Sequence, residues 1–312
     1  MRTCGNGVGH QPIIWRHQAR PERQSRPYGQ VASEQCGPRT PCQLTRNKEL
    51  FMFIEAIRHD RILVAFALIG VAAVSWLYLL AGAGMDMVPM QHGVMTMHPQ
   101  IPDWNIGYIL VMFAIWWVMM IAMMLPSAAP MILVFASANT KAATSRSAAV
   151  PTSIFAAGYL LVWGGFSMLA TLLQWGLSSA RLLDPMLQTN SNLLAAGLLI
   201  SAGAYQFSPL KSACLHHCRG PVQFISQYWQ SGRIGALKMG FSHGTFCLGC
   251  CWFLMALLFY GGVMNLLWIG GLALYVLLEK LAPRGDILGK ITGAGLFIWG
   301  LSLLWPLISN AI

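Results

Sequence analysis

The sequence predicts an all-α membrane protein, a polytopic bundle of about seven transmembrane helices with its N-terminus in the cytoplasm. Of its 312 residues, 56% are hydrophobic and only 10% are charged, whereas a soluble domain carries roughly 25% charged residues. The apolar residues fall in long blocks, and a helix needs about 20 such residues to cross the hydrocarbon core. These two observations exclude an ordinary soluble globule and a disordered or fibrous chain.

Seven blocks are long enough to be considered as spans. They run from Ile62 to Gly82, Ile106 to Ser137, Ser153 to Leu177, Asn192 to Phe207, His243 to Tyr260, Met264 to Leu281 and Ile287 to Ile308. The fourth block is the shortest. The fifth and sixth are separated by only three residues, Gly261 to Val263, which predicts a tight helical hairpin.

The orientation follows from the distribution of cationic residues. Of the 20 Lys and Arg residues, only Arg181 falls on the side opposite the N-terminus. Because Lys and Arg accumulate in cytoplasmic segments, the N-terminus is predicted to be cytoplasmic and Ile312 external. The net charge of +10 is thereby explained without nucleic acid as a partner. We expect a multi-pass protein of the bacterial inner membrane, with the lipid bilayer as its main partner.

The first 51 residues differ from the remainder. They are rich in Arg, Gln, Pro and Gly and lack the apolar core of a signal peptide. They are interpreted as a disordered extension, or as a mis-assigned start if translation begins at Met52. Residues 52–312 would then form the seven-helix transmembrane domain.

Two short stretches carry the residues suited to metal chemistry. Their thiols and imidazoles are Cys214, His216, His217, Cys218, His243, Cys247, Cys250 and Cys251. Residues four apart share one face of a helix, so Cys214 pairs with Cys218, and His243 pairs with Cys247. Thiolate and imidazole suit Cu(I) and zinc. We therefore predict a metal site at the cytoplasmic face, although buried cysteine is also a common small hydrophobe in helices.

The loop after the first span is rich in methionine and histidine. It contains Met85, Met87, Met90, His92, Met95, Met97 and His98. Thioether sulfur binds Cu(I) without deprotonation, so this loop is predicted to capture metal outside the cell. The alternative is an amphipathic segment in the membrane interface with methionine as filler.

The second span contains a series of methionines, which we interpret as a transfer path. They are Met112, Met119, Met120, Met123 and Met124. Pro126 and Pro130 predict a break or kink near the cytoplasmic end of this span. Broken helices line binding sites in transporters; the alternative is a kinked helix with methionine packing.

The absence of charge from the interior of the spans restricts the mechanism. Glu279 and Lys280 are expected at a cytoplasmic helix end, and the apolar interior of the seven predicted spans contains no Asp, Glu, Lys or Arg. Ionisable residues in membranes mark ion paths, so their absence argues against a proton-driven antiporter. No P-loop, HExxH or GxSxG motif is present, and this favours a protein that is not an enzyme.

Several strings resemble a family of bacterial membrane proteins known as domain of unknown function 2182, described as predicted metal-binding integral membrane proteins. These strings are MMIAMMLPSAAPM, GYLLVWGGFS, GAYQFSPLKSACLHHCRGP and HGTFCLGCCWFLM. The likeness covers the chain from the first span to the last. It implies a polytopic inner-membrane protein with a metal site and no defined activity. It directs attention to Met119, Met120, Met123, Met124, Pro126, Lys211, Cys214, His217, Cys218, His243, Cys247, Cys250 and Cys251.

The leading hypothesis is an inner-membrane protein that binds a soft transition metal, Cu(I) before zinc, for uptake, transfer or sensing. A metallochaperone or another membrane subunit would be its partner. One alternative is a membrane thiol-disulfide oxidoreductase or electron-transfer subunit, in which the cysteines cycle as dithiol pairs. Another is a structural or assembly subunit with a stabilising zinc ion.

Overall fold

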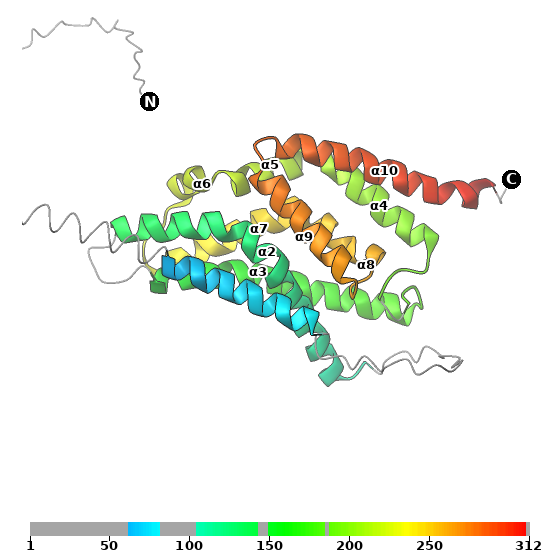
Figure 1. Ribbon diagram of the computed structural model, residues 1–312, viewed down its shortest axis with the longest axis horizontal. Coiled ribbons are helices and arrows are strands. Elements are labelled where there is room, and N and C mark those ends of the chain that lie inside the picture. The colour runs from blue at the N-terminus through cyan, green and yellow to red at the C-terminus, as the bar shows by residue number, and fades with distance from the viewer. Residues whose placement is uncertain (1–61, 82–103, 143–148, 185–186, 310–312) are drawn as a thin grey trace, which may run out of the picture. The chain divides into compact units, whose positions relative to one another are not determined.

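The computed structural model describes residues 62–81, 104–142, 149–184 and 187–309, and within these ranges the chain is helical (Figure 1). The described residues form no β-strand beyond one isolated bridge between Leu183 and Thr189. The extension 1–51 and the Met/His loop, with Met85, Met87, Met90, His92, Met95, Met97 and His98, lie outside the described residues.

The described helices begin with Ile62–Leu80. They continue with α2 (Ile106–Ala142), α3 (Ala149–Ser179), α4 (Asn192–Gln206), α5 (Pro209–Arg219), α6 (Pro221–Tyr228), α7 (Gly232–Ala256), α8 (Leu258–Gly261), α9 (Leu266–Leu281) and α10 (Gly285–Ser309). The turn after α8 contains Gly262 at a φ of 92°, and the Asn265 side chain caps α9. Gly tolerates this positive φ because it lacks a Cβ.

Five of the described helices are long and apolar enough to cross a membrane, as expected of a multi-pass membrane protein, and a sixth crossing arises if α4 and α5 form one span. The two are bent by 65° relative to each other. Pro209 opens α5 without a backbone N–H, and Ser208 caps it. The sixth predicted span, Met264 to Leu281, corresponds to α9, whose 16 residues fall short of a full span by length.

The predicted fifth span began at His243, whereas α7 begins at Gly232. The Arg233 to Ser242 stretch carries two cations and two glycines, so its composition suggested a loop. The thiols of α7 therefore lie near the middle of a long helix rather than at its start.

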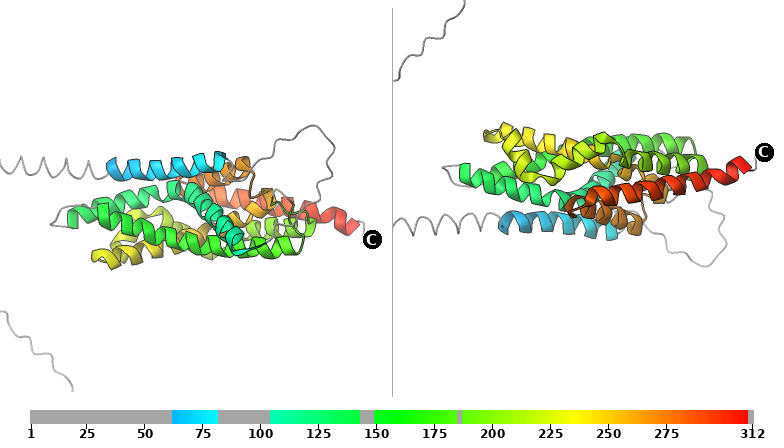
Figure 2. Two further views of the ribbon diagram at one scale, coloured as in Figure 1. Left: turned by 90° about the horizontal axis from the view of Figure 1, so that it is seen from below. Right: turned by 90° about the horizontal axis from the view of Figure 1, so that it is seen from above.

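Both prolines of the second span are accommodated within α2, which is continuous over 37 residues. Pro126 has no N–H for the carbonyl of Ala122, and the Trp76 Nε1 donates to that oxygen instead at 3.1 Å. Figures 1 and 2 show that the first and second halves of α2 run in different directions. The expected kink is therefore present, and an indole satisfies the carbonyl that it frees.

Helices α3 and α7 approach closely because glycines lie between them. A Cβ on Gly240 would lie 1.9 Å from the Phe155 carbonyl oxygen, and one on Gly158 would lie 2.4 Å from that of Leu237. Small residues allow such close packing between membrane helices. Helix α4 packs in the same way against α10, and both views of Figure 2 show this pair running side by side.

We predict that Gly240→Ala destabilises the protein by about 1–3 kcal/mol, because the added methyl group meets rigid backbone. Gly165→Ala on α3 is the matched control, since a methyl group added there would have nothing within 4 Å. Thermal unfolding of the purified full chain in detergent measures both. Equal stability of the two variants would contradict the close α3–α7 contact.

Candidate metal centre

Three thiols from α7 lie in the core of the bundle. Cys247, Cys250 and Cys251 are each no more than 1% exposed. The Cys250 and Cys251 Sγ atoms donate to the Cys247 carbonyl oxygen at 3.0 and 2.9 Å. Such bonds to the preceding turn satisfy a thiol within a helix and orient its sulfur.

Helix α5 brings the other two thiols to this cluster. The Cys218 thiol lies near the Cys247 and Cys250 thiols and interacts with both. Cys214 lies one turn earlier, and its Sγ would be only 2.7 Å from a Cβ on Gly249. Both α5 thiols are half-buried, whereas those of α7 are buried. Helices α5 and α7 pack against each other, and this packing brings the two cysteine stretches to one part of the bundle.

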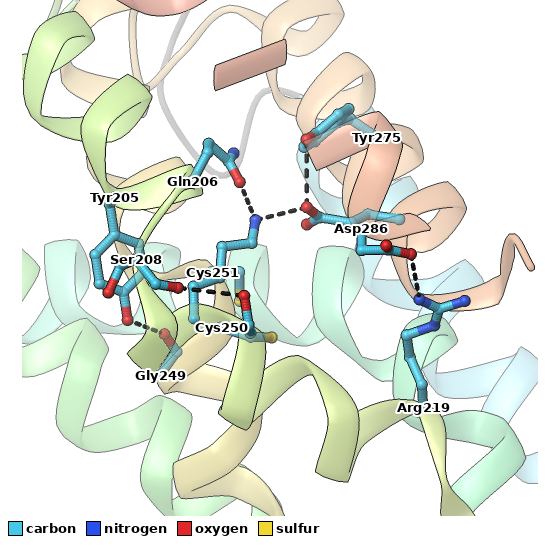
Figure 3. Close-up of polar contacts among 12 residues, drawn as sticks. Tyr205, Gln206, Ser208, Arg219, Gly249, Cys250, Cys251, Tyr275 and Asp286 are labelled. Atoms are coloured by element: carbon cyan, nitrogen blue, oxygen red, sulfur yellow. Dashed lines mark hydrogen bonds and ion pairs between the residues drawn. The ribbon is translucent and has the colours of Figure 1, made fainter. Parts of the chain in front are cut away.

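A tyrosine on α4 fixes the α7 backbone at this point. The Tyr205 hydroxyl donates to the Gly249 carbonyl oxygen at 2.5 Å (Figure 3). Figure 3 shows this bond next to Cys250 and Cys251. The glycine leaves room for Cys214, and the tyrosine holds the peptide group, so α4, α5 and α7 meet at the thiols.

Cys247 has two further polar neighbours. The Lys280 Nζ donates to its Sγ at 2.9 Å and to the Ser127 Oγ at 3.1 Å. The Tyr159 hydroxyl lies 3.1 Å from the same sulfur and also donates to the Met124 carbonyl oxygen at 3.2 Å. An ammonium group beside a sulfur favours the thiolate, which is the form that binds metal.

His243 lies one turn before Cys247 and is buried. Its ring stacks near Phe155 and Tyr159, with ring centroids 6.2 and 5.6 Å apart. Its Nδ1 is buried without a hydrogen-bond partner in the described structure. A buried ring nitrogen without a partner carries a desolvation cost and is available as a ligand.

The two histidines of α5 make other contacts. His217 stacks on Phe246 at 4.3 Å, and its Nδ1 lies 2.9 Å from the Ala213 carbonyl oxygen. His216 lines a pocket together with Arg219 and Asp286. Neither imidazole is thus brought to the thiols by the contacts of the described residues.

The thiols of the described helices lie near one another without forming a closed set of ligands. Within the described ranges, no group of three or more His, Cys, Asp or Glu side chains is arranged to hold a metal ion as it stands. A closed zinc site needs four ligands, whereas Cu(I) is a soft ion that two sulfur ligands can hold. The arrangement suits a site that closes around a metal of low coordination number.

The methionines of α2 form a buried column that ends at the thiols. Met112, Met119, Met120, Met123 and Met124 are at most 3% exposed. The Met124 Sδ lies 4.0 Å from the Cys251 Sγ. At the other end, Gln174 donates to the Met112 Sδ at 3.4 Å. The column covers about 18 Å along the helix, at 1.5 Å per residue.

Charged residues inside the bundle were not anticipated from the sequence. Lys211 is 3%, Glu279 1% and Lys280 7% exposed; Glu279 and Lys280 do lie at the end of α9, but they are buried there. Lys211 and Glu279 form an ion pair at 2.6 Å. Lys211 also donates to the side-chain oxygen of Gln206, and the Tyr275 hydroxyl donates to Glu279 at 3.4 Å; Figure 3 draws Gln206 and Tyr275.

Helical spacing contains the signal that predicts their burial. Leu272, Val276, Glu279 and Lys280 recur at the intervals of one helix face, and the first two are buried. The inward face of α9 continues through residues 279 and 280, so Glu279 and Lys280 are buried in the core. The buried acid and bases also remove the argument against proton coupling.

Comparison with known proteins gives one match. A family model described as "PpoB2: Copper chaperone" matches residues 113–303, which include most of the methionine column and all five thiols. No curated protein matches the chain. No solved structure matches it.

Proposed function

The chain belongs to the PpoB2 family, described as copper chaperone, and from this premise we propose that it is a multi-pass membrane protein that binds Cu(I) and passes it to a partner. Cys218 and Cys247 are the proposed pair of ligands, and Cys250 is the neighbouring sulfur that can exchange with them. The observation that carries the proposal is the packing of α5 on α7, which brings the Cys218 thiol near those of Cys247 and Cys250. Soft thiolates suit Cu(I), and the family description favours copper over zinc.

The gradient of exposure supports transfer rather than permanent storage. Cys214 and Cys218 are half-buried, and Cys247 is fully buried. Copper would first meet Cys214, then exchange onto Cys218, and then reach Cys247 by stepwise replacement of one sulfur by the next. His243, with its unpartnered ring nitrogen, is a further proposed ligand at the inner end of this route.

The methionine column supports a second branch of the route. Its thioethers are neutral soft donors, and Met124 contacts Cys251. We assign Met112, Met119, Met120, Met123 and Met124 to weak, exchangeable ligation, and the Met/His loop at residues 85–98 to capture of copper. With the N-terminus cytoplasmic, the thiols would lie toward the cytoplasm, in a bacterial inner membrane.

The two alternative functions, thiol-disulfide oxidoreductase and structural zinc subunit, require different behaviour of the cysteines. A thiol-disulfide oxidoreductase would use the same Cys218 contacts, but in cells its cysteines would form reversible disulfides. A structural zinc subunit would need a closed set of four ligands. The pairwise contacts and the family description favour copper over both.

We expect the full chain, purified in detergent from copper-supplemented cells, to retain copper after a wash with a Cu(I) chelator. Cys218→Ser loses this copper because a hydroxyl is a poor ligand for a soft ion. His216→Ala is the matched control and keeps it, since His216 faces the pocket with Arg219 and Asp286 rather than the thiols. Elemental analysis gives the copper per chain. Equal copper content in the Cys218 variant and the wild type would show that Cys218 does not hold the metal.

A further inference from the structure

Lys280 differs from the other buried ionisable groups because no carboxylate of the described residues pairs with it. Lys211 and Glu279 neutralise each other, and the second ion pair of the described residues joins Arg219 to Asp286. The Lys280 Nζ instead contacts the Ser127 hydroxyl and the Cys247 sulfur. A buried cation without a counter-charge is strongly unfavourable. An anion bound next to Lys280 would therefore be stabilised.

The charge of a metal-thiolate complex depends on the metal. Two thiolates with Cu(I) carry one net negative charge, and two thiolates with Zn(II) are neutral. Beside one ammonium group, the copper complex gives a neutral site, and the zinc complex leaves a buried positive charge. In a low-dielectric interior this difference favours the monovalent ion.

We propose that Lys280 is a positioning residue that determines metal specificity, selecting a soft monovalent cation over a divalent one at the Cys218–Cys247 pair. This inference rests on the proposed function and adds to it the choice of metal. When Cu(I) binds, the two sulfurs donate to the metal, and any thiol proton is released to water on the half-buried Cys218 side. Copper stays Cu(I), and Lys280 keeps its proton and balances the complex.

The neighbours of Lys280 on other helices are consistent with this role. Ser127 on α2 and Tyr159 on α3 are neutral hydroxyl groups, and Ser127 also donates to the Met124 carbonyl oxygen. Ser127 thus holds the lysine and Tyr159 the Cys247 sulfur, and neither group contributes a charge. A purely structural lysine at the end of α9 would extend toward solvent, as long cationic side chains do near membrane surfaces.

The test compares Cu(I) and Zn(II) affinities of the full chain in detergent, each measured by competition with a chelator of known affinity and without oxygen. Lys280→Met removes the charge, and Lys280→Arg retains it. Lys290→Met removes an exposed charge from the neighbouring α10 and is the matched control. A second pair leaves Lys280 intact: Ser127→Asp adds a compensating carboxylate, and Ser127→Asn has the same size without the charge.

We expect Lys280→Met to lower Cu(I) affinity by roughly 10–100-fold, the range for partners that support a metal ligand, while Zn(II) affinity is unchanged or rises. Ser127→Asp shifts the ratio in the same direction, and the Arg, Asn and Lys290 variants keep the wild-type ratio. If Lys280→Met does not fold, the Ser127 pair decides the question alone.

An equal loss of both metals in Lys280→Met, or an unchanged ratio in Ser127→Asp, would overturn the role of Lys280 while leaving copper binding intact. Wild-type protein that binds no Cu(I) through its cysteines would overturn the proposed function, and this inference with it.

Discussion

Replacing Cys247 and Cys250 together by Ser is expected to lower Cu(I) affinity by at least about 100-fold, because groups that merely support a ligand are worth roughly 10–100-fold. These two sulfurs supply the contacts with Cys218. The bond from Cys250 to the Cys247 carbonyl oxygen can be reproduced by a serine hydroxyl, so the helix is expected to fold. Chelator competition with the purified full chain measures the affinity.

Cys251→Ser is the matched control for this double substitution. Cys251 lies on the same helix, is equally buried and bonds to the same carbonyl oxygen, but its sulfur faces Met124. We expect it to retain nearly wild-type Cu(I) affinity. A loss as large as that of the double variant would show that the ligands have been assigned to the wrong sulfurs.

Glu279→Gln is expected to destabilise the protein by about 3–5 kcal/mol, because it leaves Lys211 as an uncompensated buried charge. The two groups are 2.6 Å apart, and both are almost inaccessible. They join α5 to α9, and the side-chain oxygen of Gln206 at the end of α4 accepts a hydrogen bond from the same lysine. Thermal unfolding in detergent measures the loss.

The exposed ion pair provides the comparison. Arg219 and Asp286 are 3.5 Å apart, and their side chains are 23% and 60% exposed. Asp286→Asn should therefore cost only about 0–1 kcal/mol. Replacing the buried pair together, by Lys211→Met with Glu279→Leu, should restore part of the stability lost in Glu279→Gln. Similar losses in Glu279→Gln and Asp286→Asn would contradict the buried ion pair.

The sequence predicted the helices better than their ends. Apolar length identified the core of α2, α3, α4 and α10, because a hydrophobic block is a local property. The start of α7 at Gly232 was missed because its glycines, which a soluble protein would place in a loop, serve here as the contact with α3.

The candidate site was predicted in part for the same physical reason. Residue spacing placed Cys214 with Cys218 and His243 with Cys247 on helix faces, which is again local. The bend between α4 and α5, which carries Cys218 to Cys247, depends on tertiary packing. The burial of Lys211, Glu279 and Lys280 also depends on tertiary packing, because each charge is tolerated only through partners on other helices.

The central claim is that copper is held by sulfur atoms from α5 and α7 together. X-ray absorption at the copper edge of the copper-loaded full chain tests it most directly. We predict Cu(I) with sulfur as its dominant neighbour, and the loss of a sulfur neighbour in Cys218→Ser but not in His216→Ala. A spectrum of Cu(II) with only nitrogen and oxygen neighbours, unchanged in the Cys218 variant, would contradict the claim.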